Sequence, residues 1–291
     1  MNHAPAPLEA DPAAIVAGFE RRARRYETPC GEHGVAVWRA WGDRPPVLLL
    51  HGSHGAWSHW IRNIDALVAA GRTVWAPDLP GYGESDLPPV EEHVGLAAVL
   101  AIGMRRLMTA ALPVDVVGFS FGGVLATHLA ALYPDLVRRL ILVDVGGLGT
   151  PVGPIHMERV RGLEGEAKRA ALRANLLGLM LHDPASVDEL ALHMQVENGF
   201  RGRLKPATLV TPDRLIEALP RVEAPVDAIW GEYDRPHPEP HSQEAVLRRF
   251  KPDLEFRVVP GAGHWSMYER PDAFNHALLE MLAKSPRPRL G

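Results

Sequence analysis

The sequence has little cysteine, no long apolar run and no excess of positive charge. Its single cysteine, Cys30, cannot form an internal disulfide. Cysteine usage therefore indicates neither an oxidising nor a reducing compartment. No stretch approaches the roughly 18 uninterrupted apolar residues that a membrane-spanning helix needs. The formal net charge of -4 argues against a nucleic-acid-binding protein, which would normally carry a basic excess or a basic face. We therefore expect neither a membrane nor a nucleic acid among the partners.

The first residues also lack a basic start followed by an apolar run, so they do not resemble a signal peptide, and we expect a cytoplasmic protein. What is present is ordinary for a globular enzyme: 46% hydrophobic and 23% charged residues. The length of 291 residues suffices for one large core with an inserted subdomain.

Strands and helices alternate along most of the chain. Tyr26–Cys30 and Gly34–Trp41 are predicted as two strands joined by a turn, which suits an antiparallel entry to a sheet. Val47–Leu50 is apolar on both faces, as in a strand covered by helices on each side. Further strands are predicted at 73–76, 114–117, 140–143, 226–230 and 254–259, with helices at 93–111, 121–133, 243–250 and 271–283. This alternation predicts an α/β fold with a mainly parallel, eight-stranded sheet and helices on both faces.

The alternation breaks after Asp144. A Gly-rich connector is followed by mostly helical sequence without a convincing strand, which is long for a plain crossover. We therefore divide the chain into a first core part (1–146), a helical cap (147–215) and a second core part (216–291). The cap is expected over the carboxyl ends of the strands. The tail 285–288 is expected to be disordered.

The stretch around Ser120 predicts a reactive site. The apolar run 114–117 leads into Gly118–Gly122 and then into a helical pattern, which indicates a strand, a sharp turn and a helix. Two glycines would allow so abrupt a reversal, with the serine hydroxyl exposed at its apex. The start of the helix adds N–H groups and a positive dipole end beside that hydroxyl. By this geometry the N–H of Phe121 is one donor of an oxyanion hole.

An activated serine needs a base and an acceptor that orients the base, and two loops at strand ends offer them. Asp234 follows the predicted strand 226–230, and His264 follows 254–259. Both would lie on the sheet edge that carries Ser120. Asp144 also follows a strand and is an alternative acid, although the Gly-x-x-Asp turn fits Asp234 better.

These features together resemble the α/β-hydrolase fold over nearly the whole chain, in which the triad follows the order Ser, Asp, His. The resemblance rests on five motifs in order: Gly118–Gly122, His51–Gly52, Asp78–Ser85, Gly231–Asp234 and Gly261–His264. It implies Ser120 as nucleophile, His264 as base and Asp234 as its orienting acid. It also implies the backbone N–H of Ser53 as the second oxyanion donor.

A metal or another cofactor is not expected. His237 and His241 are four residues apart, but the intervening prolines prevent the helix that would align them, and no H-E-x-x-H motif occurs.

The substrate is expected to be a small molecule. Residues 54–64, the Gly-rich stretch 146–149 and Trp265 resemble carbon-carbon bond hydrolases that cleave ring-fission dienoates. That resemblance implies substrate contacts for Asn63 and Trp265 and, by position only, for a cap arginine, Arg201 or Arg203. Those enzymes usually carry Asn before the nucleophile, where this chain has Phe119.

The sequence therefore favours a carboxylic ester hydrolase, with carbon-carbon bond cleavage as the alternative. Trp57, Trp60 and Trp265 fit aromatic packing under the cap as well as substrate contact. A ligand-binding relative, a perhydrolase and a homodimer also stay open.

Overall fold

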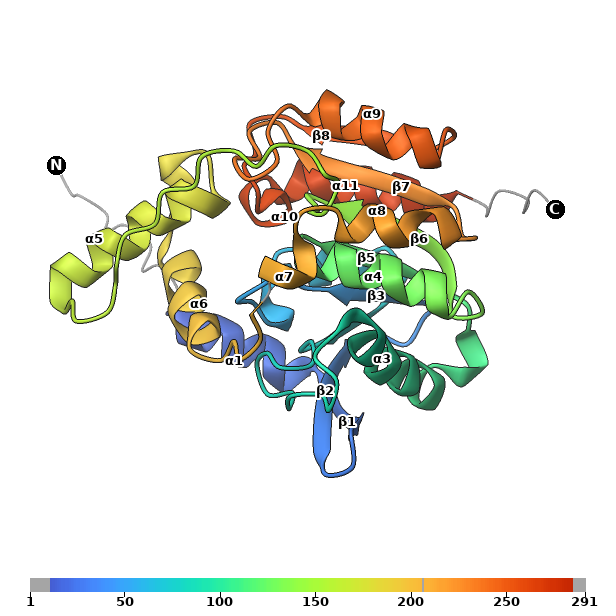
Figure 1. The fold of residues 1–291 in the computed structure, drawn as a ribbon. Helices are drawn as coiled ribbons and strands as arrows, with labels where there is room; N and C mark the ends of the chain where they lie inside the picture. The colour runs from blue at the N-terminus through green and yellow to red at the C-terminus, as the bar shows by residue number, and fades with distance from the viewer. Residues whose placement is uncertain (1–10, 206, 285–291) are drawn as a thin grey trace, which may run out of the picture.

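The computed structural model describes residues 11–205 and 207–284, built around one eight-stranded sheet (Figure 1). The tail 285–288 lies outside the described residues. Along the sheet the strand order is β1-β2-β4-β3-β5-β6-β7-β8. The strands are β1 (Arg24–Cys30), β2 (Gly34–Trp41), β3 (Pro46–Leu50), β4 (Thr73–Pro77), β5 (Val114–Phe119), β6 (Val137–Val143), β7 (Val226–Gly231) and β8 (Phe256–Val259). The predicted α/β-hydrolase fold with eight strands is confirmed.

The strand directions follow from the lengths of the connections. β1 pairs antiparallel with β2 through a short turn at Gly31, whose φ of 80° favours glycine. β2 also runs antiparallel to β4, while the remaining neighbours are parallel. Parallel neighbours need long crossovers, and the helices supply them. The carboxyl ends of β3 to β8 therefore share one edge.

Both faces of the sheet are buried, because alternate side chains of each strand pack into two different hydrophobic clusters, one on each face. Leu48 and Leu50 belong to a cluster with helices α3, α4, α8 and α9, whereas Val47 and Leu49 belong to one with α2 and α11, against which α1 also packs. This explains the uninterrupted apolar run of β3. The bounds are α1 (Pro12–Arg22), α2 (Ile64–Ala69), α3 (His93–Leu107), α4 (Phe121–Leu132), α8 (Arg214–Ala218), α9 (Pro240–Phe250) and α11 (Pro271–Ala283). The short helices η1 (Trp57–Trp60) and α10 (Ser266–Glu269) add further buried residues, while η2 (Thr109–Ala111) is exposed.

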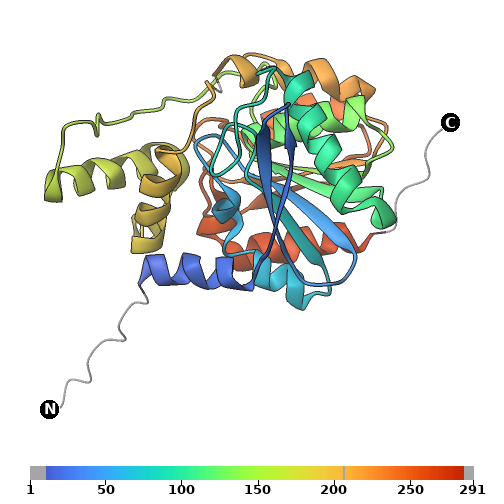
Figure 2. The same cartoon turned by 90° about the horizontal axis from the view of Figure 1, so that it is seen from below.

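Between β6 and β7 the described residues form helices and no strand. These are α5 (Gly165–Asn175), a π-helical turn η3 (Leu176–Met180), η4 (Pro184–Ser186), α6 (Glu189–Gly199), α7 (Ala207–Val210), α8 and η5 (Leu219–Arg221). In Figures 1 and 2, α5 and α6 stand to one side of the sheet, and α6 contacts α1. By contrast, α7 and α8 pack on α4. That 147–215 acts as a separate cap stays a prediction.

The helical segment is tied to the loop that carries His264. The N–H of Trp265 donates to the carbonyl of Met180 at 2.7 Å. The buried carboxylate of Glu269 accepts the N–H groups of His182 and Asp183 at 2.6 to 3.0 Å. These contacts hold the end of η3 beside the carboxyl edge of the sheet.

Candidate active site

Ser120 lies at the turn between β5 and α4, in a conformation that few residues adopt. Its φ is 51° and its ψ is -121°, and its N–H donates to the carbonyl of Val143 at 2.9 Å. A Cβ on Gly122 would lie 2.4 Å from the carbonyl oxygen of His51, and one on Gly118 would lie 2.5 Å from the Cα of Gly123. The turn therefore needs glycine at both positions, because its backbone packs against itself and against the end of β3.

The structure brings Ser120, His264 and Asp234 into one hydrogen-bonded chain. His264 Nε2 lies 3.1 Å from Ser120 Oγ, and His264 Nδ1 lies 3.0 Å from Asp234 Oδ1. An ionised carboxylate only accepts hydrogen bonds, so Nδ1 carries the hydrogen and Nε2 is free to accept from the serine hydroxyl. This is the arrangement in which an imidazole can take up a serine proton.

The second acid, Asp144, has other partners. Its carboxyl accepts the Gly231 N–H at 2.6 Å and the Ser266 hydroxyl at 2.5 Å. Burial, and then the nearby Asp234 carboxylate, raise the pKa of Asp144 well above its usual value. Burial would also raise the pKa of Asp234, but His264 and His237 outweigh it and lower that pKa to about 2. Asp234 is thus the ionised acid on His264, whereas the raised pKa of Asp144 favours its protonated form.

The loop after β3 lies against the nucleophile. A Cβ on Gly52 would fall 3.2 Å from the Cβ of Ser120, so the backbone that leads into Ser53 passes close to the nucleophile. Phe121 is the first residue of α4, and its N–H therefore has no acceptor within the helix. Both positions suit the predicted oxyanion donors, whose role stays a prediction.

Comparison with known proteins places the fold in a family. A model of the alpha/beta hydrolase family matches residues 47–277. The chain belongs to the alpha/beta hydrolase family. A 2-hydroxy-6-oxo-6-phenylhexa-2,4-dienoate hydrolase of Burkholderia cepacia is 32% identical over 260 residues, which cover 83% of this chain and 89% of the relative. A 2-hydroxy-6-oxononadienedioate/2-hydroxy-6-oxononatrienedioate hydrolase of Comamonas testosteroni is 30% identical, with coverage of 83% and 89%.

Solved structures agree on the fold of this α/β-hydrolase. The bromoperoxidase of Bacillus anthracis superposes with a TM-score of 0.74 at 20% identity, covering 90% of this chain and all of that one. Within residues 11–205 and 207–284, no helix combines the length and apolar character that crossing a membrane would require.

The two predicted substrate residues of this α/β-hydrolase are occupied with structural contacts. The Asn63 side chain is fully buried, and its amide donates to the Met267 carbonyl at 3.0 Å and to Asn275 Oδ1 at 2.8 Å. The Trp265 indole donates to the His59 carbonyl at 3.0 Å and stacks on Tyr268. A substrate contact for either side chain stays a prediction.

Sequence reasoning missed two histidines beside the triad. The ring of His59 lies 5.7 Å from that of Phe119, and its Nδ1 has no hydrogen-bond partner in the part of the chain that the structure describes. His237 Nδ1 lies 3.2 Å from Asp234 Oδ2. Its position three residues after Asp234, in a tight turn, is the only signal that could have found it. One nitrogen or oxygen atom from each of His237, Asp234 and His264 lies within 4.8 Å of the others, as in a metal site. In this structure, however, the two imidazoles are hydrogen-bonded to the carboxylate.

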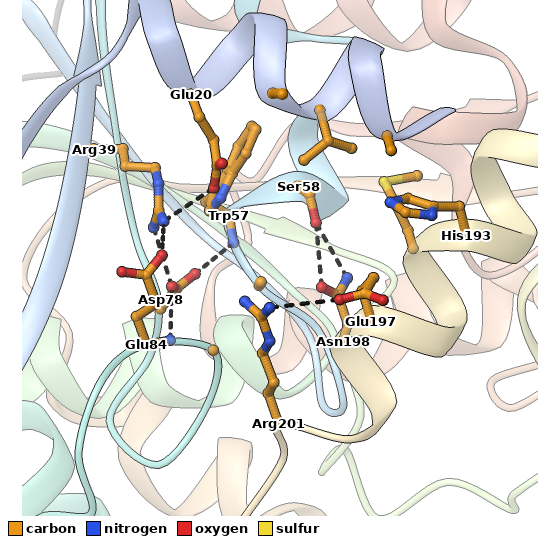
Figure 3. A pocket seen from close by; sticks show the side chains of 16 residues that line it. Glu20, Arg39, Trp57, Ser58, Asp78, Glu84, His193, Glu197, Asn198 and Arg201 are labelled. Carbon is orange, nitrogen blue, oxygen red and sulfur yellow. Dashed lines mark hydrogen bonds and ion pairs between the residues drawn. The ribbon is translucent and has the colours of Figure 1, made fainter. Parts of the chain in front are cut away.

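A cavity of about 720 Å³ opens between α1, α6 and η1, away from the triad (Figure 3). Several polar side chains that line it are paired: Arg39 with Asp78 at 3.1 Å, and Arg201 with Glu197 at 3.5 Å. The other predicted cap arginine, Arg203, donates to the Ser85 carbonyl. Neither arginine is placed beside Ser120 by these contacts, so a substrate role for one of them stays a prediction.

We expect the fold to lose stability in acid because His51 must stay neutral. Its Nδ1 donates to the Gly52 carbonyl at 2.7 Å, so its Nε2 is bare and accepts the Leu79 N–H at 2.9 Å. Burial lowers the pKa of His51 from 6.5 to about 4. The unfolded chain thus binds this proton first, and stability falls by about 3 kcal/mol as pH drops from 6.5 to 4.

Urea denaturation at several pH values would measure this loss. His51→Gln, which keeps an acceptor for Leu79 but cannot ionise, should show a shallower dependence of unfolding free energy on pH. An identical dependence in the two proteins would contradict the expectation.

Proposed function

We propose that this α/β-hydrolase cleaves a small-molecule carbonyl substrate with Ser120 as nucleophile, His264 as base and Asp234 as its orienting acid. The hydrogen-bonded chain of these three side chains carries the proposal. Ser120 Oγ attacks the carbonyl carbon while its proton passes to His264 Nε2. The N–H groups of Ser53 and Phe121 would hold the oxyanion. His264 then protonates the leaving group, and water releases the acyl group from Ser120.

For the substrate, we propose a ring-fission dienoate of the 2-hydroxy-6-oxo type, cleaved at a carbon-carbon bond. The curated relatives of about 30% identity over most of both chains support it, since they are named as hydrolases of such compounds. This reverses the order that the sequence favoured. Before cleavage the 2-hydroxydienoate must tautomerise to its 2-oxo form: the enol hydroxyl loses its proton and C5 gains one. The C5–C6 bond then breaks after Ser120 attacks C6, and the leaving dienolate spreads its charge over several atoms until it is protonated. The buried His59 imidazole, whose Nδ1 lacks a hydrogen-bond partner among the described residues, offers a polar partner near Phe119.

A carboxylic ester is the second candidate, and Phe119 favours it. Its ring centroid lies 5.0 Å from that of His264, and its side chain is 1% exposed. The residue before the nucleophile therefore presents an apolar surface to the triad rather than an amide. An ester does not need a hydrogen-bond donor at that point, whereas the negatively charged oxygen of a dienolate does.

Steady-state kinetics on both substrate classes test the choice. We expect kcat/KM for 2-hydroxy-6-oxo-6-phenylhexa-2,4-dienoate to exceed that for p-nitrophenyl butyrate by roughly 100-fold. Phe119→Asn should raise the dienoate-to-ester ratio about tenfold, because it adds an amide donor. Phe119→Leu replaces the aromatic ring by a smaller apolar side chain without adding a hydrogen-bond donor, and it is the matched control. Rapid ester turnover with negligible loss of the dienoate would reject the first candidate in favour of the second.

A further inference from the structure

We infer that His237 is a positioning residue for the triad, which holds the second carboxylate oxygen of Asp234 so that the first stays aimed at His264. The inference rests on the proposed function, because it takes His264 as the base.

The contacts of His237 place it on the far side of the acid. Its Nδ1 lies 3.2 Å from Asp234 Oδ2, and its backbone N–H donates to Oδ1 at 3.2 Å. Oδ1 also accepts from His264 Nδ1 at 3.0 Å. The Asp234 side chain has no exposed surface, while that of His237 is 12% exposed. One buried carboxylate therefore bridges two imidazoles.

The imidazole of His237 has little freedom to turn away. Its ring meets Trp230 edge-on at 6.1 Å, and its carbonyl accepts the Trp230 indole N–H at 3.2 Å. Prolines at 236 and 238 flank it. On the opposite side, a Cβ on Gly146 would lie 3.0 Å from Nε2, which is tighter than most contacts, so this loop packs closely against the ring.

The chemistry of the carboxylate requires such a partner. An ionised carboxylate in a buried site is costly unless its oxygens receive donors. Within residues 11–205 and 207–284, three N–H groups reach it, and His237 Nδ1 is the one that reaches Oδ2. Because the carboxylate accepts only, both imidazoles carry hydrogen on Nδ1. Without His237, Asp234 would keep one bare oxygen and could rotate away from His264.

Two substitutions test whether the hydrogen-bond donor of His237 positions Asp234. His237→Leu removes the donor, and we expect kcat at the plateau pH to fall about tenfold with little change in KM. His237→Asn places an amide N–H near the position of Nδ1, and it should restore kcat to within about threefold of the wild type. His241→Asn, an exposed histidine on α9, is the matched control.

Nitrogen-15 NMR of the histidine rings at the plateau pH gives a readout that needs no substrate. In the wild type and in His237→Asn the ring of His264 should carry its hydrogen on Nδ1, whereas His237→Leu should show a mixture of the two tautomers. Unchanged kcat in His237→Leu, or an unchanged His264 tautomer in that variant, would overturn the inference. If His237→Leu does not fold, His237→Ala takes its place. Failure of a fluorophosphonate to label Ser120 would instead reject the proposed function and leave the NMR test standing.

Discussion

Replacing Ser120 by alanine is expected to lower kcat roughly a million-fold, to the small rate that binding and the oxyanion donors supply alone. The hydroxyl is the only group at this turn that can form a bond to the substrate carbon, and its described side-chain contact is with His264. KM should change little, since the hydroxyl contributes to the reaction rather than to ground-state binding. Consumption of the dienoate, followed by its absorbance, measures the effect.

Two controls accompany this variant. Ser242→Ala removes an exposed hydroxyl on α9 that bonds to Glu239, and it should retain the wild-type rate. A fluorophosphonate should label the wild type and Ser242→Ala at Ser120 but leave Ser120→Ala unlabelled. Substantial hydrolysis by folded Ser120→Ala would show that another group forms the covalent bond or that water attacks directly.

Asp234→Asn should have the next largest effect, a fall in kcat of roughly 10,000-fold. Both carboxylate oxygens receive imidazole N–H donors, from His264 and His237. An asparagine has one acceptor oxygen and one NH2 group, so it would meet one imidazole N–H with its own donor. If that imidazole is His264, its hydrogen moves to Nε2, and the ring can no longer accept the proton of Ser120. If it is His237, His264 still loses the negative charge that stabilises its protonated form.

Asp144→Asn is the matched control for this change. Because the carboxyl of Asp144 bonds to Gly231 and Ser266 and its pKa is raised, an amide is a close substitute, and we expect activity within about tenfold of the wild type. Kinetics of both variants, with urea denaturation to check folding, would measure the difference. Loss of activity in Asp144→Asn with activity kept in Asp234→Asn would make Asp144 the acid.

The succession of strands and helices could be predicted because burial on both faces leaves a local pattern. Val47–Leu50 shows it directly. The start of β6 was missed: the strand was predicted from residue 140, but it begins at Val137. Arg138 and Arg139 interrupt the apolar run, yet Arg138 pairs with Asp115, and Arg139 is buried and pairs with Asp227. Partners so distant in the chain leave no local signal.

The candidate site, too, could be predicted from the sequence only in part. Ser120, Asp234 and His264 could be found because each follows a recognisable strand at a glycine-marked turn, and parallel strands bring their carboxyl ends together. Their mutual distances, and the choice of Asp234 over Asp144, depend on loops that pack only in the folded chain.

Residue types and their order along the chain therefore specify the fold class and the three reactive groups, since backbone geometry and burial act over a few neighbouring residues. The folded chain alone decides what each polar atom touches. It places the Asn63 amide against Met267 and Asn275, and it turns His237 onto the acid that His264 also uses. Hydrogen bonds extend over about 3 Å, and which groups come that close is set by the packing of segments far apart in sequence.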